Sequence, residues 1–428
     1  MSVPPQKKTF LGFGLGAVQS GLMLFEAYKS GNFGRFVILE VNADLVKDVR
    51  SNRCVITINT ATKNGIIKST ISGFEIYNPT DQKDQVPIAS AIHEANEMAT
   101  AIPSTDFYDL GDNSLARLLA QNVDRQKPQI IYASENNNYA AEILLDKIKS
   151  YTDDRALSQF QTINTVIGKM GGVIQDEITV QELGLDRMTP ESRTAVLVEE
   201  FNHIIISKIR LRNYRRGIEV FQEKDDLLPF EEAKLFGHNA VHSMLGYFAA
   251  LRGYTFMSEI RNDPKLYEYG VRAFMDESGA FLLDKYREFG DPLFTREGFT
   301  YYATDLLERM TNPYLRDEVQ RICRDPLRKL DYDDRFFGTI RGALEHNVRP
   351  TILPKAVLGA ICYIIENKVN ASFPYPGSVE ELNVENVRSI IMALWKSKPL
   401  DDSGKACLDL IVGQFEEFHA EFIRPRRG

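Results

Sequence analysis

The chain has 428 residues, which exceeds the usual size of a single domain and predicts two domains. Its 43% hydrophobic and 26% charged residues are typical of a soluble globular protein. The net charge of -8 argues against a general affinity for nucleic acid or an anionic membrane, so we expect neither as a partner. The four cysteines are dispersed and form no CxxC pair, which favours a reducing, cytoplasmic setting and argues against a structural metal site.

The start of the chain has the pattern of a dinucleotide-binding turn. Residues 9–11 predict a short strand and residues 18–29 a helix, and a glycine-rich segment in GxGxxA spacing joins them. That segment consists of Gly12, Phe13, Gly14, Leu15, Gly16 and Ala17. The apolar run 9–25 also resembles a signal peptide, but its glycines and the lack of a small-residue cleavage site favour the turn. We expect a pyrophosphate to rest on the start of the helix.

A carboxylate follows the second predicted strand. Residues 36–41 are apolar except for Glu40, which is placed to accept hydrogen bonds from both hydroxyls of an adenosine ribose. The same charge would repel a 2′-phosphate, and no basic residue follows before Lys47. The pattern therefore favours NAD over NADP, with an exposed strand end as the alternative for Glu40.

Strands and helices alternate over the next hundred residues. Helices are predicted at 89–96, 114–123 and 139–149, and strands at 98–102 and 129–133. Such alternation predicts a parallel, doubly wound sheet that binds its ligand at the carboxyl ends of the strands. Four residues fall at such ends and are expected to face the cofactor or substrate: Ala101, Ile102, Glu135 and Asn136.

The region before residue 228 contains further strand patterns. Residues 162–178 have strand and turn character, and residues 195–216 have mixed strand character. Basic and apolar residues alternate over 206–212, which predicts a strand with one cationic face. This face is either an anion site or, as the favoured alternative, a solvated surface.

From Pro229 onward the pattern changes to successive helices, predicted at 229–251, 258–261, 265–287, 299–310, 314–323 and further on to 421. We therefore predict a Rossmann-type α/β domain with added strands over residues 1–228. An all-α domain is predicted over residues 229–428.

The first of these helices carries three polar residues in Lys-x4-Asn-x2-His spacing. At roughly 100° per residue, His242 falls near 80° and Asn239 near 140° from Lys234, so all three can face one cavity. The helix is otherwise apolar and should be buried, and each unpaired polar group in it would cost about 1–3 kcal/mol. A substrate is one possible partner. His238, taken alone, is read as a core residue.

The segment KLFGHNAVHSMLGYFAALRGY, which carries this spacing, resembles the signature of the mannitol dehydrogenase family of polyol-specific long-chain dehydrogenases. The resemblance extends to SENN at 134–137, NTVIGKM at 164–170, AFMDESG at 273–279 and NPYLRDEVQRICRDPLRKL at 312–330. Within the family, the chain is most similar to the branch that acts on mannitol 1-phosphate. It departs from that branch in its glycine-rich turn and lacks an Asp-Arg pair at residues 173–174.

This resemblance implies metal-independent hydride transfer to NAD. It implies that Lys234 is the general base, and that Asn239 and His242, with Asn136 on the cofactor side, bind the reacting oxygen. Glu231 either passes the proton outward or only stabilises the start of the helix. A phosphorylated substrate needs cations, for which we expect Arg324, Arg328 and Lys329, and next Lys208, Arg210 and Arg212.

Two other functions remain open from the sequence. One is a dehydrogenase of free polyols or sugar acids, of the mannitol 2-dehydrogenase or fructuronate reductase type. The other is a non-catalytic NAD-binding sensor. The chain is expected to be a monomer or a dimer.

Overall fold

The computed structural model describes residues 7–395, 398 and 401–424. The chain forms two compact units, Met1–Phe230 and Glu231–Gly428. The boundary falls inside the short helix α7 (Leu228–Glu232), close to the boundary expected from the sequence.

The first unit is built on an eight-stranded sheet with the strand order β12-β11-β8-β7-β6-β1-β2-β5. Strand β1 (Lys8–Phe13) lies in the middle, parallel to β2 (Phe33–Leu39) on one side and to β6 (Glu97–Thr100) on the other. The remaining strands are β5 (Glu75–Tyr77), β7 (Gln129–Ala133), β8 (Phe160–Val166), β11 (Ile205–Ser207) and β12 (Gln222–Lys224). The strand order reverses at β1, which is where doubly wound sheets bind ligands.

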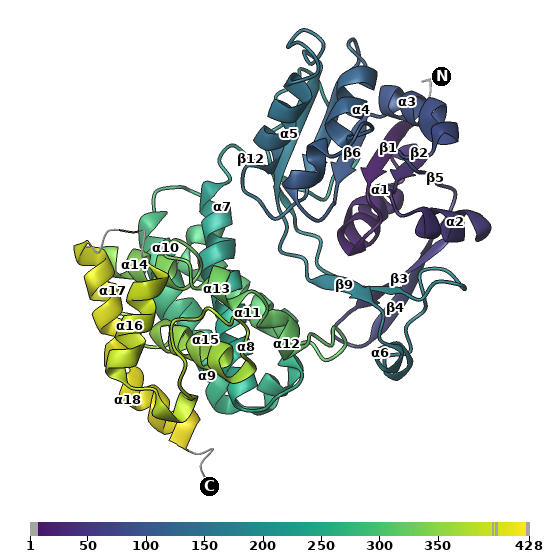
Figure 1. Ribbon diagram of the computed structural model, residues 1–428. Helices are drawn as coiled ribbons and strands as arrows, with labels where there is room; N and C mark the ends of the chain where they lie inside the picture. Colours follow the sequence, from purple (N-terminus) through teal and green to yellow (C-terminus); the bar gives the residue numbers. More distant parts are fainter. Residues whose placement is uncertain (1–6, 396–397, 399–400, 425–428) are drawn as a thin grey trace. The chain divides into compact units, whose positions relative to one another are not determined.

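The two faces of β1 belong to different cores because successive side chains point to opposite sides. Leu11 and Phe13 pack with the helices α3 (Gln85–Glu94), α4 (Leu115–Asn122) and α5 (Ala140–Lys149), which lie along the sheet in Figure 1. Phe10 packs on the other face with helix α1 (Leu24–Ser30). The predicted parallel sheet covered by helices is confirmed from β5 to β8, whereas β11 pairs with β8 in the antiparallel direction.

A second, four-stranded sheet has the order β4-β3-β10-β9. Its strands are β3 (Ile56–Ala61), β4 (Ile66–Ile71), β9 (Gly171–Ile174) and β10 (Ala195–Glu199). Residues 43–51 and 177–182, for which no helix was expected, form α2 (Ala43–Ser51) and α6 (Glu177–Glu182). Both helices begin with a side-chain cap, from Asn42 and Asp176.

The predicted cationic strand at 206–212 is wrong beyond Ser207, where β11 ends. Strand β12 runs parallel to β11, and two parallel neighbours need a connection that returns along the sheet. Residues 208–221 form that connection, so their alternating pattern does not become a strand. Lys208 forms an ion pair with Asp225 at 2.8 Å.

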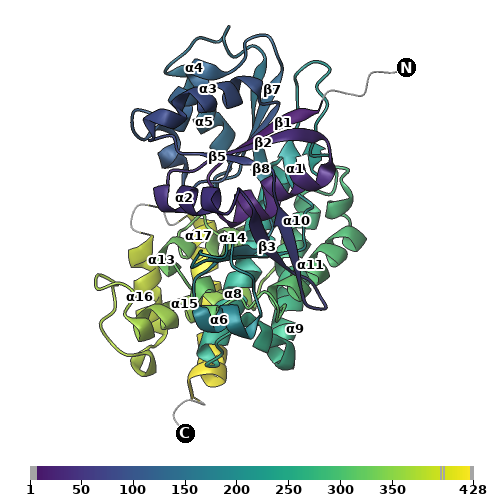
Figure 2. The ribbon, with the colours of Figure 1, turned by 90° about the vertical axis from the view of Figure 1, so that its right-hand side faces the viewer.

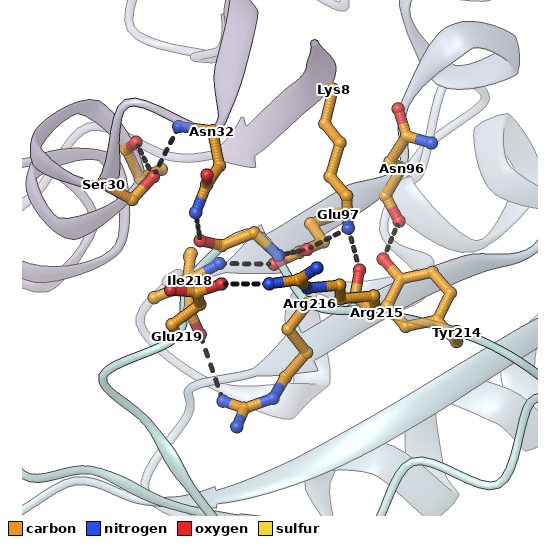
Figure 3. A network of polar contacts seen from close by, with 12 residues as sticks. Lys8, Ser30, Asn32, Asn96, Glu97, Tyr214, Arg215, Arg216, Ile218 and Glu219 are labelled. Carbon is orange, nitrogen blue, oxygen red and sulfur yellow. Dashed lines mark hydrogen bonds and ion pairs between the residues drawn. The ribbon is translucent and has the colours of Figure 1, made fainter. Parts of the chain in front are cut away.

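A buried carboxylate anchors this connection to the start of the sheet (Figure 3). Glu97, at the first position of β6, is fully buried and accepts hydrogen bonds from the backbone N–H of Gly217 and Ile218. Tyr132 donates to it at 3.0 Å, and Lys8 Nζ lies 3.4 Å away. The contacts fix the connection at the end of the sheet opposite the glycine-rich turn, since Lys8 and Glu97 begin parallel strands.

The second unit is helical in the part that the structure describes, apart from a bridge between Phe256 and Glu318. Helix α8 (Ala240–Leu251) is almost entirely buried and packs against α9 (Pro264–Arg272), α12 (Val319–Ile322) and α15 (Leu353–Asn367). Figure 2 shows α8 next to α15. The other helices are α10 (Gly279–Lys285), α11 (Arg296–Met310), α13 (Pro326–Lys329), α14 (Phe337–Glu345), α16 (Val384–Leu394), α17 (Asp402–Gly413) and α18 (Phe415–Phe418).

The helix expected at 314–323 is shorter than predicted. Arg316 has a φ of 47°, a left-handed conformation that interrupts helix formation, and α12 begins only at Val319. Among the described residues, no helix is long and apolar enough to cross a membrane.

Candidate active site

The glycine-rich turn lies at the carboxyl end of β1. Gly12 and Phe13 belong to the strand, and Gly14 turns the chain with a φ of 86°. A Cβ on Gly14 would lie 2.8 Å from the carbonyl oxygen of Ala101, so only glycine fits without displacing that neighbour. A Cβ on Gly16 would meet no atom within 4 Å, which leaves room for a ligand to approach the backbone there.

Glu40 lies directly beside this turn. One carboxylate oxygen accepts a hydrogen bond from the backbone N–H of Leu15 at 2.8 Å, and the other accepts from Asn42 at 2.9 Å. The side chain is half-buried at the end of β2. A turn open at Gly16 and an acceptor next to it fit the pyrophosphate and ribose of a dinucleotide.

The next two strand ends are held together by Glu135. This buried carboxylate accepts hydrogen bonds from Ile102 N at 3.0 Å and from Thr100 Oγ1 at 2.7 Å, and Tyr108 donates to it as well. Burial and the neighbouring carboxylate raise the pKa of Tyr108 well above its usual value. Glu135 therefore positions the backbone of residues 101–102 beside the turn, and Asn136 follows it in an exposed bend. Direct contacts of these residues with a cofactor stay predictions.

The helix with the Lys-Asn-His spacing is not a uniform α-helix. Residues Ala233–Asn239 form a π-helical segment between α7 and α8. In a π-helix the backbone bonds join residues five apart and each turn takes more than four residues, so Asn239 lies closer to the direction of Lys234 than it would in an α-helix. The angle of 140° expected between them is wrong, because it assumed an α-helical turn throughout. π-Helical turns of this kind are frequent at functional sites.

Lys234 lies in a setting that favours its neutral form. The pKa of its ammonium group is lowered to about 8, mainly by burial and also by Arg335, while Glu231 acts in the opposite direction. An amine with such a pKa exchanges protons near neutral pH, which an ordinary exposed lysine does not.

His242 has a carboxylate partner that sequence patterns did not reveal. Its Nε2 lies 3.2 Å from Oδ2 of Asp317, which is buried at the approach to α12. Arg321 contacts the other oxygen, Oδ1, through Nε at 2.7 Å and Nη2 at 2.6 Å. Burial raises the pKa of Asp317, but His242 and Arg321 outweigh it and keep that pKa below its usual range. Asp317 lies within the NPYLRDEVQRIC segment of the resemblance, yet 75 residues from His242 in sequence.

His238 is buried one helical turn from His242, and the two ring centroids are 5.8 Å apart. Burial, His242 and nearby cations including Arg309 lower the pKa of His238 well below its usual value. The spacing His238-x3-His242 is also found in metal sites. Among the described residues, however, no three His, Cys, Asp or Glu side chains are grouped as metal ligands.

The three cations expected to hold a phosphate have different environments. Arg324 is exposed, and Arg328 is half-exposed with Asp334 3.5 Å away. Lys329 is buried and donates to the carbonyl oxygen of Ile322, and burial lowers its pKa to about 8. Of the two exposed arginines, Arg328 is the one linked to the buried Arg335, because Asp334 contacts both of them.

Arg335 is a further cation that sequence patterns did not reveal. It is buried before α14 and donates to Ser243 Oγ on α8 at 3.2 Å and to Asp334 Oδ1 at 2.8 Å. It also lowers the pKa of both Lys234 and His238. No pattern in the sequence marks this arginine, because its contacts join segments about 90 residues apart.

Comparisons with known proteins agree with this geometry. Residues 226–377 match the mannitol dehydrogenase C-terminal domain. The chain is 26% identical to a mannitol-1-phosphate 5-dehydrogenase of Caldanaerobacter subterraneus subsp. tengcongensis, over 91% of this chain and 95% of that protein. It is 24% identical to the enzyme of the same name from Lacticaseibacillus casei, over 80% of this chain and 88% of that protein.

Two solved structures share the fold. A D-sorbitol dehydrogenase in substrate-free form is similar with a TM-score of 0.70 at 12% identity, over 97% of this chain and 93% of that chain. The Pseudomonas fluorescens mannitol 2-dehydrogenase ternary complex with NAD and D-mannitol is similar with a TM-score of 0.64 at 14% identity, over 99% and 94%.

Over most of its length the chain is similar to enzymes of the mannitol dehydrogenase family, and its residues 226–377 match the C-terminal domain of that family. The resemblance read from the Lys-x4-Asn-x2-His segment is thereby confirmed, and so is the expectation that the chain is a dehydrogenase. The fold of a mixed α/β unit followed by a helical unit is also confirmed.

Proposed function

We propose that this protein is a mannitol dehydrogenase family member, an NAD-dependent enzyme that interconverts mannitol 1-phosphate and fructose 6-phosphate. The observation that carries the proposal is Lys234, a lysine with a pKa of about 8 in a π-helical turn that also contains Asn239. The relatives named mannitol-1-phosphate 5-dehydrogenase, which align over most of the chain, support the choice of substrate.

In the oxidative direction, neutral Lys234 takes the proton of the reacting hydroxyl. The hydride leaves the carbon that bears this hydroxyl, and NAD, when bound, would supply the acceptor. Asn239 donates a hydrogen bond to the oxygen as it becomes a carbonyl, a contribution typically worth about 3–4 kcal/mol. Glu231 raises the pKa of Lys234 and so offsets part of the effect of burial. In the reductive direction the ammonium form of Lys234 returns the proton to the carbonyl oxygen.

The glycine-rich turn and Glu40 are proposed to hold the cofactor. The open face of Gly16 and the helix that follows it suit a pyrophosphate. The carboxylate of Glu40 suits ribose hydroxyls and repels a 2′-phosphate, which supports NAD over NADP.

We expect Arg328 to bind the phosphate of the substrate. Arg328→Ala should raise the KM for both fructose 6-phosphate and mannitol 1-phosphate by about tenfold, because it removes a charge-assisted hydrogen bond. Initial rates at varied substrate concentration measure this effect. Arg287→Ala, which removes an exposed arginine that pairs with Asp284 and Glu288, is the control. Unchanged KM values in Arg328→Ala would exclude Arg328 as the phosphate ligand.

A second candidate is a dehydrogenase of free polyols or sugar acids. The structural similarity to a D-sorbitol dehydrogenase and a mannitol 2-dehydrogenase favours it. An absorbance assay of NADH oxidation with fructose 6-phosphate, fructose and fructuronate separates the candidates. We expect the highest kcat/KM for fructose 6-phosphate, and a preference for fructose or fructuronate would overturn the assignment. Absence of turnover with every substrate despite NADH binding would favour a non-catalytic sensor.

A further inference from the structure

Asp317 is held rigidly by its surroundings. The side chain is 1% exposed, its backbone carbonyl accepts from Met257 N at 2.9 Å, and Arg321 occupies Oδ1 through two nitrogens. The preceding residue, Arg316, has a left-handed backbone and stacks over the ring of Phe256. These contacts leave Oδ2 as the oxygen that faces His242, at 3.2 Å from Nε2.

The 3.2 Å contact between Oδ2 and Nε2 favours one nitrogen of His242 as the one that carries the proton. A carboxylate only accepts hydrogen bonds, so Nε2 must carry a hydrogen when it faces Oδ2. In the neutral ring Nδ1 then has a lone pair and can only accept a hydrogen bond. Neutral His242 therefore cannot donate to the reacting oxygen, which was the role expected from the sequence.

We propose that Asp317 is a positioning residue that fixes the ring and tautomer of His242, so that Nδ1 accepts a hydrogen bond from a substrate hydroxyl while Asn239 alone donates to the reacting oxygen. The assignment of the substrate hydroxyl rests on the proposed function, whereas the tautomer does not. The arrangement makes Asp317 a determinant of catalysis that does not itself touch the substrate.

Other charged groups near His242 come from three elements. His238 lies on the same helix, Arg321 reaches His242 only through Asp317, and Arg335 donates to the neighbouring residue Ser243. None of these three groups offers the His242 ring an acceptor among the described contacts, whereas Asp317 does. Its carboxylate also balances the charge of the ring when His242 is protonated.

The direct test is the tautomer of His242, measured by ¹⁵N NMR of the full chain labelled in histidine. His242→Gln identifies the signal among the six histidines. At pH about 7.5 we expect the Nε2–H tautomer in the unaltered protein. The Nδ1–H tautomer there would overturn the proposal without any other variant.

Asp317→Asn should reverse the tautomer. Arg321 can only donate hydrogen bonds, so the carbonyl oxygen of the new Asn side chain turns to Arg321. The NH₂ group of that side chain then faces Nε2, which must accept a hydrogen bond from it. The ring proton moves to Nδ1, and kcat should fall by at least about a hundredfold with NADH affinity unchanged, as expected for a ring held in the wrong tautomer.

Glu277→Gln is the matched control, since it also changes a buried carboxylate of the helical unit to an amide. Glu277 accepts from the backbone of Thr351, Ile352 and Leu353 at the start of α15 and is not placed in the site. It should lose stability but keep the tautomer and kcat. An Asp317→Asn protein with the original tautomer, or with a kcat like that of Glu277→Gln, would refute the positioning role. If Asp317→Asn reverses the tautomer but the unaltered protein turns over none of the tested sugars, the control of the tautomer by Asp317 is supported and the proposed function is refuted.

Discussion

At the scale of single residues, the chemistry depends on how the fold changes the properties of ordinary side chains. Lys234 is partly buried next to Arg335, and this environment lowers its pKa to about 8. The sequence predicted Lys234 as the general base through the family resemblance, and its apolar neighbours predicted burial. Arg335 could not be foreseen, since it approaches from the segment before α14.

The pKa of Lys234 predicts opposite pH dependences for the two directions. Oxidation of mannitol 1-phosphate needs the neutral amine, so kcat should rise about tenfold per pH unit below pH 8 and level off above it. Reduction of fructose 6-phosphate needs the ammonium form, so its kcat should decline above pH 8. Rates of NADH formation and consumption between pH 6 and 10 measure both profiles.

Lys234→Ala should lower kcat by about 10²- to 10⁴-fold and remove the pH dependence that this lysine causes. Lys265→Ala, which changes an exposed lysine on α9, is the control and should leave both profiles unchanged. A Lys234→Ala enzyme with the kcat of the unaltered protein would contradict the role of the lysine as base.

At the scale of elements, two departures from regular structure shape the site. The turn after β1 requires a left-handed residue at Gly14, and the GxGxxA spacing predicted this turn. The π-helical segment that contains Lys234 and Asn239 was not predicted. Its side chains pack against residues distant in sequence, such as Phe281 near Phe236 and Tyr302 near Gly237, and periodicity within one helix carries no record of those contacts.

Gly14→Ala should weaken NADH binding by at least about tenfold, because the new Cβ would meet the carbonyl oxygen of Ala101 and the backbone must leave its left-handed conformation. Fluorescence titration with NADH measures the Kd. Gly31→Ala also places alanine at a positive φ, 69°, but its Cβ meets no atom within 4 Å. It should lose about 1 kcal/mol of stability with its Kd for NADH unchanged. Equal Kd values for the two variants would contradict the role of Gly14.

At the scale of the molecule, the Glu97 network and the proposed cofactor site lie at opposite ends of the first unit's sheet. The glycine-rich turn follows the carboxyl end of β1, whereas the Glu97 network binds the returning connection at the amino ends of β1 and β6 (Figure 3). Changes at one end should therefore leave the function of the other largely intact.

Glu97→Gln should lower the free energy of unfolding by about 1–3 kcal/mol, because a buried amide cannot accept all the hydrogen bonds that the carboxylate accepts. Urea unfolding measures this loss, and the Kd for NADH below the transition should stay within about twofold of the unaltered value. Loss of NADH affinity in the folded variant would show that the two ends of the sheet are coupled.

The sequence by itself determined the alternation of strands and helices around β1, the glycine-rich turn and the family resemblance of the Lys-Asn-His segment. Each of these depends on residues close together in the chain, where spacing and periodicity reflect local backbone geometry. Only the tertiary structure decided the partner of His242, the cation next to Lys234 and the course of residues 208–221. Asp317, Arg335 and Glu97 act on segments far away in sequence, and packing in three dimensions brings them into contact with their partners.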